Sequence, residues 1–211
     1  MGIVLICILY GILPVLFYNK IYSKFYIQLK PIIPFVVLTI CSNVYELLGT
    51  LLLKWNAKYW FFLYDILSFV TIYNFYYKIL NRQYKSLFVL SISLFILITL
   101  LLLYYSTLDA ILINTIFTSS LQTLFVLVFS MFWFIKLFRD ANVENLFANS
   151  NFYFISGFII YYCGTLFLFL FGNYFYKESV ALFHEYWILN IILNIVLTSF
   201  LLLGLWKAQK N

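Results

Sequence analysis

Two carboxylates inside long apolar segments are the residues of this sequence best placed to do chemistry. Glu46 precedes Lys54 by eight residues, and Asp65 follows Lys58 by seven. In helices that rise about 1.5 Å per residue, both acids lie about 10–12 Å from the short loop that joins their segments. An ionised carboxylate inside a membrane helix costs about 2.5–3.5 kcal/mol, so it needs a polar partner, a proton or a watery cavity. The matching depth of the two acids predicts a shared site.

Polar side chains on other apolar segments extend this candidate site. On each segment they are spaced three or four residues apart, which places them on one face of a helix. The predicted ligand-binding site consists of Glu46, Asp65, Asn43, Asn114, Thr118, Asn190 and Asn194. A pocket of this composition, open to the outer side of the membrane, suits a small cationic or hydroxylated ligand, or a proton.

Two structural interpretations of the same residues remain open. Hydroxyl and amide side chains join helices in many membrane bundles, at about 0.6 kcal/mol per interaction. Long lysine side chains also bend toward nearby charges, so Lys54 or Lys58 could neutralise the acids and close the hairpin.

The chain lacks the residues on which most established membrane enzymes and receptors depend. His184, the single histidine, lies in a predicted loop, whereas iron-dependent membrane hydroxylases need histidine clusters and zinc proteases need an HExxH pair. Segment 186–206 contains no lysine, which excludes the retinal linkage of microbial rhodopsins. We therefore expect no catalytic residue, no metal and no cofactor, and an activity that is not enzymatic.

Composition places the chain in a lipid bilayer. Of its 211 residues, 65% are hydrophobic and 9% are charged, and the mean hydropathy is +1.01. A soluble domain carries about 25% charged residues, so this composition excludes a soluble globular protein. The formal net charge of +6 is explained by the basic residues that orient a protein in the membrane. No nucleic-acid partner is expected.

The apolar residues form continuous runs that are long enough to cross a bilayer as helices. About 20 residues are needed for each crossing. The runs cover residues 2–18, 31–53, 59–80, 86–105, 110–135, 151–175 and 186–206. The sequence thus predicts an all-α fold, a polytopic bundle of seven transmembrane helices that forms a single domain over residues 1–211. Segment 86–105 has few polar residues after Ser93 and is expected to be the most lipid-exposed.

The basic residues are unevenly divided between the two sets of loops. The loops after the odd-numbered segments carry ten of the thirteen basic residues: Lys20, Lys24, Lys30, Lys78, Arg82, Lys85, Lys136, Arg139, Lys207 and Lys210. The opposite side has Lys54, Lys58 and Lys177. Because basic loops remain in the cytoplasm, the N-terminus is expected outside and the C-terminus in the cytoplasm. The expected location is the inner (cytoplasmic) membrane of the cell.

Several stretches resemble one family of membrane proteins. These stretches are NVYELLGTLL with Glu46, WFFLYDILSF with Asp65, and the C-terminal half from FIKLFRDANVENLF through WILNIILNIVL to LWKAQK. They are similar to small seven-helix membrane proteins of Bacteroidota that are often encoded beside sensor histidine kinases. The family often has Glu where this chain has Asp65. The resemblance implies an association with signalling.

Three functions fit these residues. The leading hypothesis is a non-enzymatic sensor or accessory component of a signalling system, which needs a separate partner such as a histidine kinase because the chain has no output domain. A small-solute or proton-coupled transporter is the alternative, and a lipid-active enzyme that uses a carboxylate is the third. The sequence does not specify the ligand or the oligomeric state.

Overall fold

The structure is a bundle of helices. The computed structural model describes residues 9–14, 29–53, 58–80, 84–105, 111–139, 146–178 and 180–210. After helical residues 9–14, the elements in chain order are α3 (Ile33–Tyr45), η1 (Glu46–Leu52), α4 (Lys58–Ile79), α5 (Lys85–Tyr105), α6 (Ile111–Arg139), η3 (Leu146–Ala148), α7 (Ser150–Glu178) and α8 (Val180–Lys210). In these ranges every regular element is helical, so the all-α class predicted from the sequence is confirmed there.

The helices fall where the apolar segments predict them. Helices α4 to α8 cover the predicted segments 59–80, 86–105, 110–135, 151–175 and 186–206, and α3 with η1 covers 31–53. Of the predicted first segment, 2–18, residues 9–14 are described and helical, and the rest lies outside the described residues.

Local sequence explains where two of the helices begin. Pro34 stands in the first turn of α3. The N–H groups of a first turn have no partner within the helix, so a proline, which has no N–H, costs no helical hydrogen bond there. At α7, the side chain of Asn149 accepts a hydrogen bond from the backbone N–H of Asn151 at 3.0 Å. This is the capping bond that a helix N-terminus needs.

Four of the described helices are long and apolar enough to cross a membrane. They lie at Lys85–Tyr104, Phe117–Arg139, Ser150–Leu168 and Ile188–Gln209, and a shorter apolar helix lies at Ile33–Gly49. Helix α4 is long as well, but Asp65, Asn74, Lys78 and several tyrosines lower its hydropathy. These helices suit an integral membrane protein.

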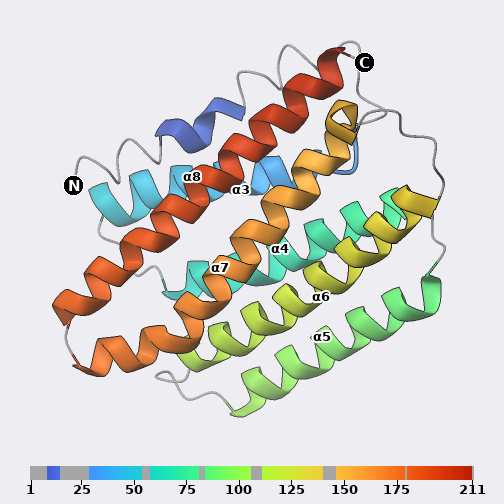
Figure 1. Cartoon of the computed structure of the whole chain (residues 1–211). Coiled ribbons are helices and arrows are strands. Elements are labelled where there is room, and N and C mark those ends of the chain that lie inside the picture. The colour runs from blue at the N-terminus through green and yellow to red at the C-terminus, as the bar shows by residue number, and fades with distance from the viewer. Residues whose placement is uncertain are drawn as a thin grey trace.

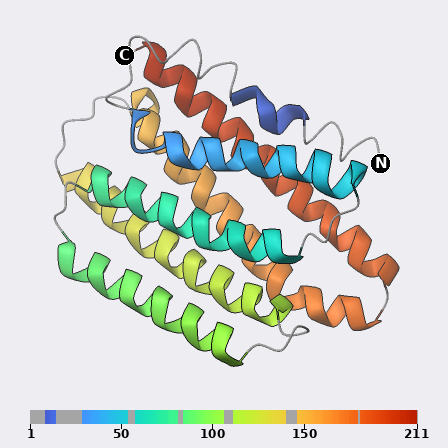
Figure 2. The same cartoon turned by 180° about the vertical axis from the view of Figure 1, so that it is seen from behind.

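Figures 1 and 2 show that α4, α6 and α7 lie side by side in the middle of the bundle. Helix α5 packs on the outer side of α4 and α6, where the rings of Phe69 and Phe95 stack with centroids 3.7 Å apart. Helix α3 packs on α4 and α7, with the ring of Phe35 edge-on to Phe158 at 4.9 Å. Helix α8 packs along α7.

The prediction of a lipid-exposed segment at 86–105 agrees with the position of α5. Only 17% of its apolar span is buried, compared with 28–39% for the other three apolar spans. Its exposed side chains are mostly large and aliphatic, such as Val89, Leu97 and Leu100. In a membrane protein this face of α5 contacts hydrocarbon.

One end of the bundle is basic. The helices alternate in direction, so the C-terminal ends of α4, α6 and α8 lie beside the N-terminal ends of α3 and α5 (Figure 1). The described basic side chains near these ends are Lys30, Lys78, Lys85, Lys136, Arg139 and Lys207. We call this end, with these six residues, the basic end.

Glycines let α7 and α8 approach closely. A methyl group built on Gly157 would lie 2.8 Å from Cβ of Phe200, and one on Gly164 would lie 2.7 Å from the side chain of Leu193. Small residues at helix contacts serve this purpose in membrane bundles. The α7–α8 hairpin is therefore the most tightly joined pair in the described bundle.

We predict that Gly157→Ala destabilises the bundle by about 1–2 kcal/mol. At a contact of 2.8 Å we expect the upper part of the cost of overpacking, about 2–3 kcal/mol, because Cβ of Phe200 cannot move without its backbone. The gain of about 1 kcal/mol in helix propensity offsets part of this cost. Denaturation of the purified protein in mixed detergent micelles measures the difference. Ile160→Ala is the control, since Ile160 lies on the same helix and is 40% exposed. Equal stability of Gly157→Ala and wild type would show that the contact is not close.

Candidate functional site

Asp65 is held by two hydroxyl groups from a neighbouring helix. Its Oδ2 accepts hydrogen bonds from Oγ1 of Thr118 at 3.2 Å and from Oγ of Ser119 at 3.0 Å. Both donors stand on α6, so the carboxylate of α4 is bonded across the α4–α6 interface. An acid in this setting gains hydrogen bonds to its oxygen, and it has no positive partner among the residues that the structure describes.

Gln122 joins three helices one turn further along α6. Its Nε2 donates to Oγ of Ser68 on α4 at 2.9 Å and to the hydroxyl of Tyr162 on α7 at 2.8 Å. The hydroxyl of Ser68 in turn donates to the backbone oxygen of Asp65 at 2.9 Å. The amide thus connects the surroundings of Asp65 to α7.

Thr123 adds a second connection between α6 and α7. Its Oγ1 lies 2.9 Å from the backbone oxygen of Ser119 and 3.3 Å from that of Tyr162. We call the whole group the polar seam and define it as Asp65, Ser68, Thr118, Ser119, Gln122, Thr123 and Tyr162. Most of it is closed to solvent, with Ser68, Thr118, Gln122 and Thr123 at most 1% exposed.

A layer of apolar side chains ends the polar seam on the side of the basic end. On α4 the order Ser68, Ile72, Tyr76 repeats every four residues, and α6 follows with Gln122, Val126, Ser130. This spacing puts each set on one helix face. Ile72 and Val126 are fully buried, and beyond them Tyr76 and Ser130 form a separate hydroxyl pair at 2.6 Å. The seam is therefore not continuous through the described bundle.

Glu46 lies at the start of the π-helical turn η1. Insertions of this kind are frequent at functional sites. Its carboxylate and that of Asp65 both lie within electrostatic range of the phenol groups of Tyr64 and Tyr161. Neither acid forms an ion pair among the described residues. Lys54, one of the two lysines expected to neutralise them, lies outside the described residues, as does the side chain of Lys58.

The other residues of the predicted site occupy different surroundings. Asn43 is buried and lies against Gly11, which places it beside the helical residues 9–14. Oδ1 of Asn190 is buried and has no hydrogen-bond partner among the described residues. Asn194 is partly buried on α8. The side chain of Asn114 lies outside the described residues.

The structure therefore brings together only part of the predicted set. Asp65 and Thr118 share a hydrogen bond, and Glu46 lies within electrostatic range of the same phenols as Asp65. Asn190 and Asn194 belong to α8, which packs along α7. A shared aqueous pocket for all seven residues stays a prediction.

Gln122 and Tyr162 carry the seam, yet neither is in the predicted site. Their signal is present in the sequence, because an amide and a phenol in the middle of apolar segments must find hydrogen-bond partners. The sequence of one segment indicates the helix face on which such a side chain lies, but not the partner that it bonds to.

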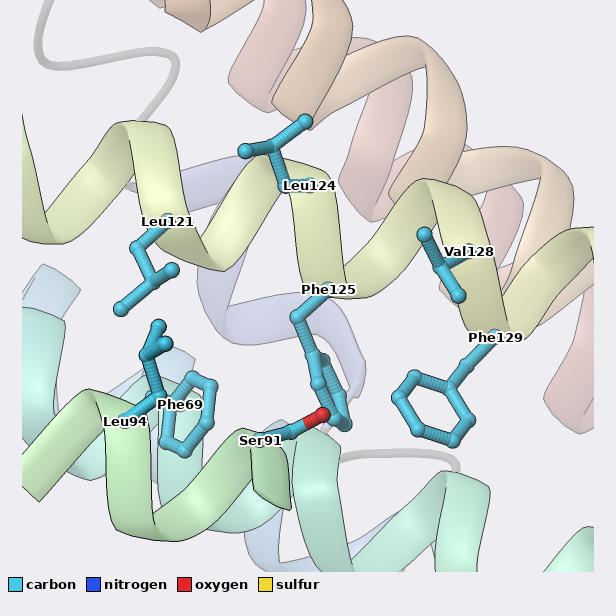
Figure 3. Close-up of a pocket in the computed structure, with 8 residues that line it drawn as sticks. All are labelled: Phe69, Ser91, Leu94, Leu121, Leu124, Phe125, Val128 and Phe129. Atoms are coloured by element: carbon cyan, nitrogen blue, oxygen red, sulfur yellow. The ribbon is translucent and has the colours of Figure 1, made fainter. Parts of the chain in front are cut away.

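A groove on the outside of the bundle is apolar (Figure 3). It lies between α5 and α6 over α4, has a volume of about 160 Å³, and is lined by Phe69, Ser91, Leu94, Leu121, Leu124, Phe125, Val128 and Phe129. The hydroxyl of Ser91 is already bonded to the backbone oxygen of Leu87 at 2.8 Å. The described residues contain no cluster of three metal-binding side chains.

We predict an energetic coupling of about 0.6–1.7 kcal/mol between Gln122 and Tyr162, the range of hydrogen bonds between membrane helices. A double-mutant cycle with Gln122→Leu and Tyr162→Phe, read by denaturation in mixed micelles, measures it. Gln122→Leu with Ser93→Ala is the control cycle, because the Ser93 hydroxyl bonds within its own helix and should be additive. Additivity in both cycles would rule out the bond.

Comparisons of the chain with protein-family models, curated proteins and solved structures give no match. The similarity to seven-helix membrane proteins of Bacteroidota stays a prediction from the sequence. The polar seam and the charge distribution are the features of the described chain that bear on its function.

Proposed function

We propose that this chain is a multi-pass protein of the inner membrane with seven transmembrane helices, its N-terminus outside and its C-terminus in the cytoplasm. The four long apolar helices support membrane insertion. The basic end supports the orientation, since basic residues concentrate on the cytoplasmic side. Helix α3 is apolar but short, and α4 is less apolar than the four long helices. Helices α3, with η1, and α4 cross the membrane by covering their polar faces against each other and the central helices.

Reporter fusions test this orientation. Green fluorescent protein fused after Asn211 should fluoresce and alkaline phosphatase at the same position should be inactive, because the first folds in the cytoplasm and the second outside. The same reporters inserted at residue 55, in the loop between η1 and α4, should give the opposite pair. An active phosphatase at the C-terminus would contradict the proposed orientation.

We infer that the protein works as a sensor or accessory component of a signalling system, and that its responsive element is the polar seam. The observation that carries this proposal is Asp65, a carboxylate bonded to Thr118 and Ser119 across a helix interface. Acidic residues inside membrane segments mark functional sites because their cost must be compensated. A proton or small cation at Asp65 neutralises the charge of the carboxylate. The hydrogen bonds from Thr118 and Ser119 of α6 then change.

The closed packing of the seam supports sensing over solute transport. Ser68, Thr118, Gln122 and Thr123 are at most 1% exposed and leave no space for a solute, whereas the partly buried Asp65 can take up a proton or a small ion. The apolar layer of Ile72 and Val126 separates the seam from the Tyr76–Ser130 pair, which favours binding from one side over passage.

Transmission to a partner follows from the helices that meet at the seam. Gln122 connects α4, α6 and α7, and a change in its bonds biases how these helices pack. A ligand can shift such an equilibrium only through a different affinity for the two arrangements. The partner is a separate cytoplasmic or membrane signalling protein, such as the histidine kinase that the resemblance implies.

A proton-coupled transporter is the second candidate, because Glu46 is a further carboxylate that forms no ion pair within the described part of the chain and lies within electrostatic range of the same phenols as Asp65. Two acids near the phenols of Tyr64 and Tyr161 suit a relay of protons. Proton flux through the wild-type protein in liposomes, lost in Glu46→Gln, would favour this function over sensing.

We predict that Asp65→Asn locks the bundle in one arrangement. Nitroxide labels at Phe138→Cys and Trp206→Cys, at the ends of α6 and α8, report their separation by pulsed electron resonance in nanodiscs at pH 5 and pH 8, with Cys7, Cys41 and Cys163 replaced by serine. The wild-type background should change its distance distribution between the two conditions, or on addition of sodium at pH 8. The Asp65→Asn variant should keep, under all these conditions, the label-to-label distance distribution that belongs to a neutral side chain at position 65.

Thr99→Val is the control for this measurement, since Thr99 is buried and bonds only within α5. It should respond like the background protein. A background that never changes, or an Asp65→Asn variant that responds fully, would contradict the sensor proposal.

A further inference from the structure

The apolar groove between α5 and α6 leads toward a corner of the basic end. Ser91 on α5 lies six residues from Lys85, and Phe129 on α6 lies seven residues before Lys136. At about 1.5 Å per residue, these lysines stand about 9–11 Å beyond the near end of the groove in the same direction. Half of a bilayer's hydrocarbon core is about 15 Å thick, so the near end of the groove lies in one leaflet when the lysines lie at its surface.

Three lysines gather at this corner from three helices. The side chain of Lys136 donates to the backbone oxygen of Ile79 at 3.5 Å, which brings the end of α6 to the end of α4, next to Lys78. The rings of Tyr84 and Phe132 stack at 4.6 Å, which brings the start of α5 and Lys85 to the same place. Lys78 and Lys85 are exposed.

The charge at this corner has no carboxylate beside it in the described part of the chain. The acids whose side chains are described, Glu46 and Asp65, belong to the other half of the bundle. A positive corner at the end of an apolar groove is complementary to a molecule with an anionic head and a hydrocarbon tail.

The walls of the groove identify the tail as an acyl chain. Leu94, Leu124 and Val128 offer only hydrocarbon, and the one polar group, the hydroxyl of Ser91, is occupied by Leu87. The groove is open to the outside and has a volume of about 160 Å³, which gives room to part of a hydrocarbon chain. The small residues that favour close approach of a partner helix are not among these three side chains, which are all branched.

We propose that this groove and corner form a binding site for an anionic phospholipid of the cytoplasmic leaflet. The phosphate lies among Lys78, Lys85 and Lys136, and one acyl chain lies between α5 and α6. The site requires membrane insertion in the proposed orientation, and it is independent of any sensing role of Asp65.

Native mass spectrometry of the full chain in detergent tests the site with phosphatidylglycerol and with phosphatidylcholine of identical acyl chains. The wild type should bind phosphatidylglycerol more tightly by at least tenfold. Lys85→Gln and Lys136→Gln should each raise its Kd about fivefold, since each basic residue near a membrane surface contributes about that factor. Lys207→Gln, at the same end of the bundle but on α8, should leave the Kd unchanged.

The groove itself is tested by Val128→Trp, which fills it and should weaken phosphatidylglycerol binding about tenfold. Leu97→Trp is the matched control on the exposed face of α5, where Leu97 is 59% exposed and does not line the groove. Unfolding temperatures in phosphatidylcholine identify any variant that fails to fold. Equal binding of the two lipids, equal loss with Lys207→Gln, or unchanged binding in a folded Val128→Trp variant would overturn the proposal.

Discussion

The hydrogen bonds from Thr118 and Ser119 to Asp65 are the interaction on which the centre of this bundle depends. Hydrocarbon provides no water to satisfy a buried polar group, so each such group must find its partner inside the protein. A carboxylate has the strongest need, because its charge is the most costly to remove from water. Helix α6 meets that need with two adjacent hydroxyl groups, which fixes how α4 and α6 face each other.

The rest of the bundle is arranged around this contact. Gln122 extends the bonded set to Tyr162 and thereby positions α7, and α7 carries α8 through the close contacts at Gly157 and Gly164. Helix α5 has no share in the polar seam and packs through apolar contacts, such as that of Phe69 with Phe95. Its outer face is left to the lipid, and the groove beside it is open to an acyl chain.

The apolar layer closes the polar seam on the side of the basic end. Ile72 and Val126 occupy the turn between Ser68 and Tyr76 on α4 and between Gln122 and Ser130 on α6. Polar groups on the two sides of this layer belong to different networks. In the proposed orientation the acids then respond to the outer side, while the basic end faces the cytoplasm and its partners.

The helical class and the helix positions could be predicted from the sequence, because continuous apolar runs of bilayer length leave few alternatives. Asp65 and Thr118 could also be singled out, since polar residues are conspicuous in such runs. The pairing of helices could not be predicted this way. Asn190 and Asn194 have the same spacing as the residues of the seam, yet they lie on α8, which packs along α7. Periodicity specifies the polar face of a helix, whereas packing decides which neighbour that face meets.

Thiol cross-linking in native membranes tests the polar seam most directly. In a chain whose own cysteines are replaced by alanine, a short bis-methanethiosulfonate reagent should join Ser68→Cys to Gln122→Cys. Nε2 of the native Gln122 reaches to 2.9 Å from Oγ of Ser68, and the reagent replaces the length that the shorter cysteine side chain lacks. Ser68→Cys with Asn194→Cys should stay unlinked. A link in the second pair and none in the first would place α8 where α6 is expected, and the account of the seam would be wrong.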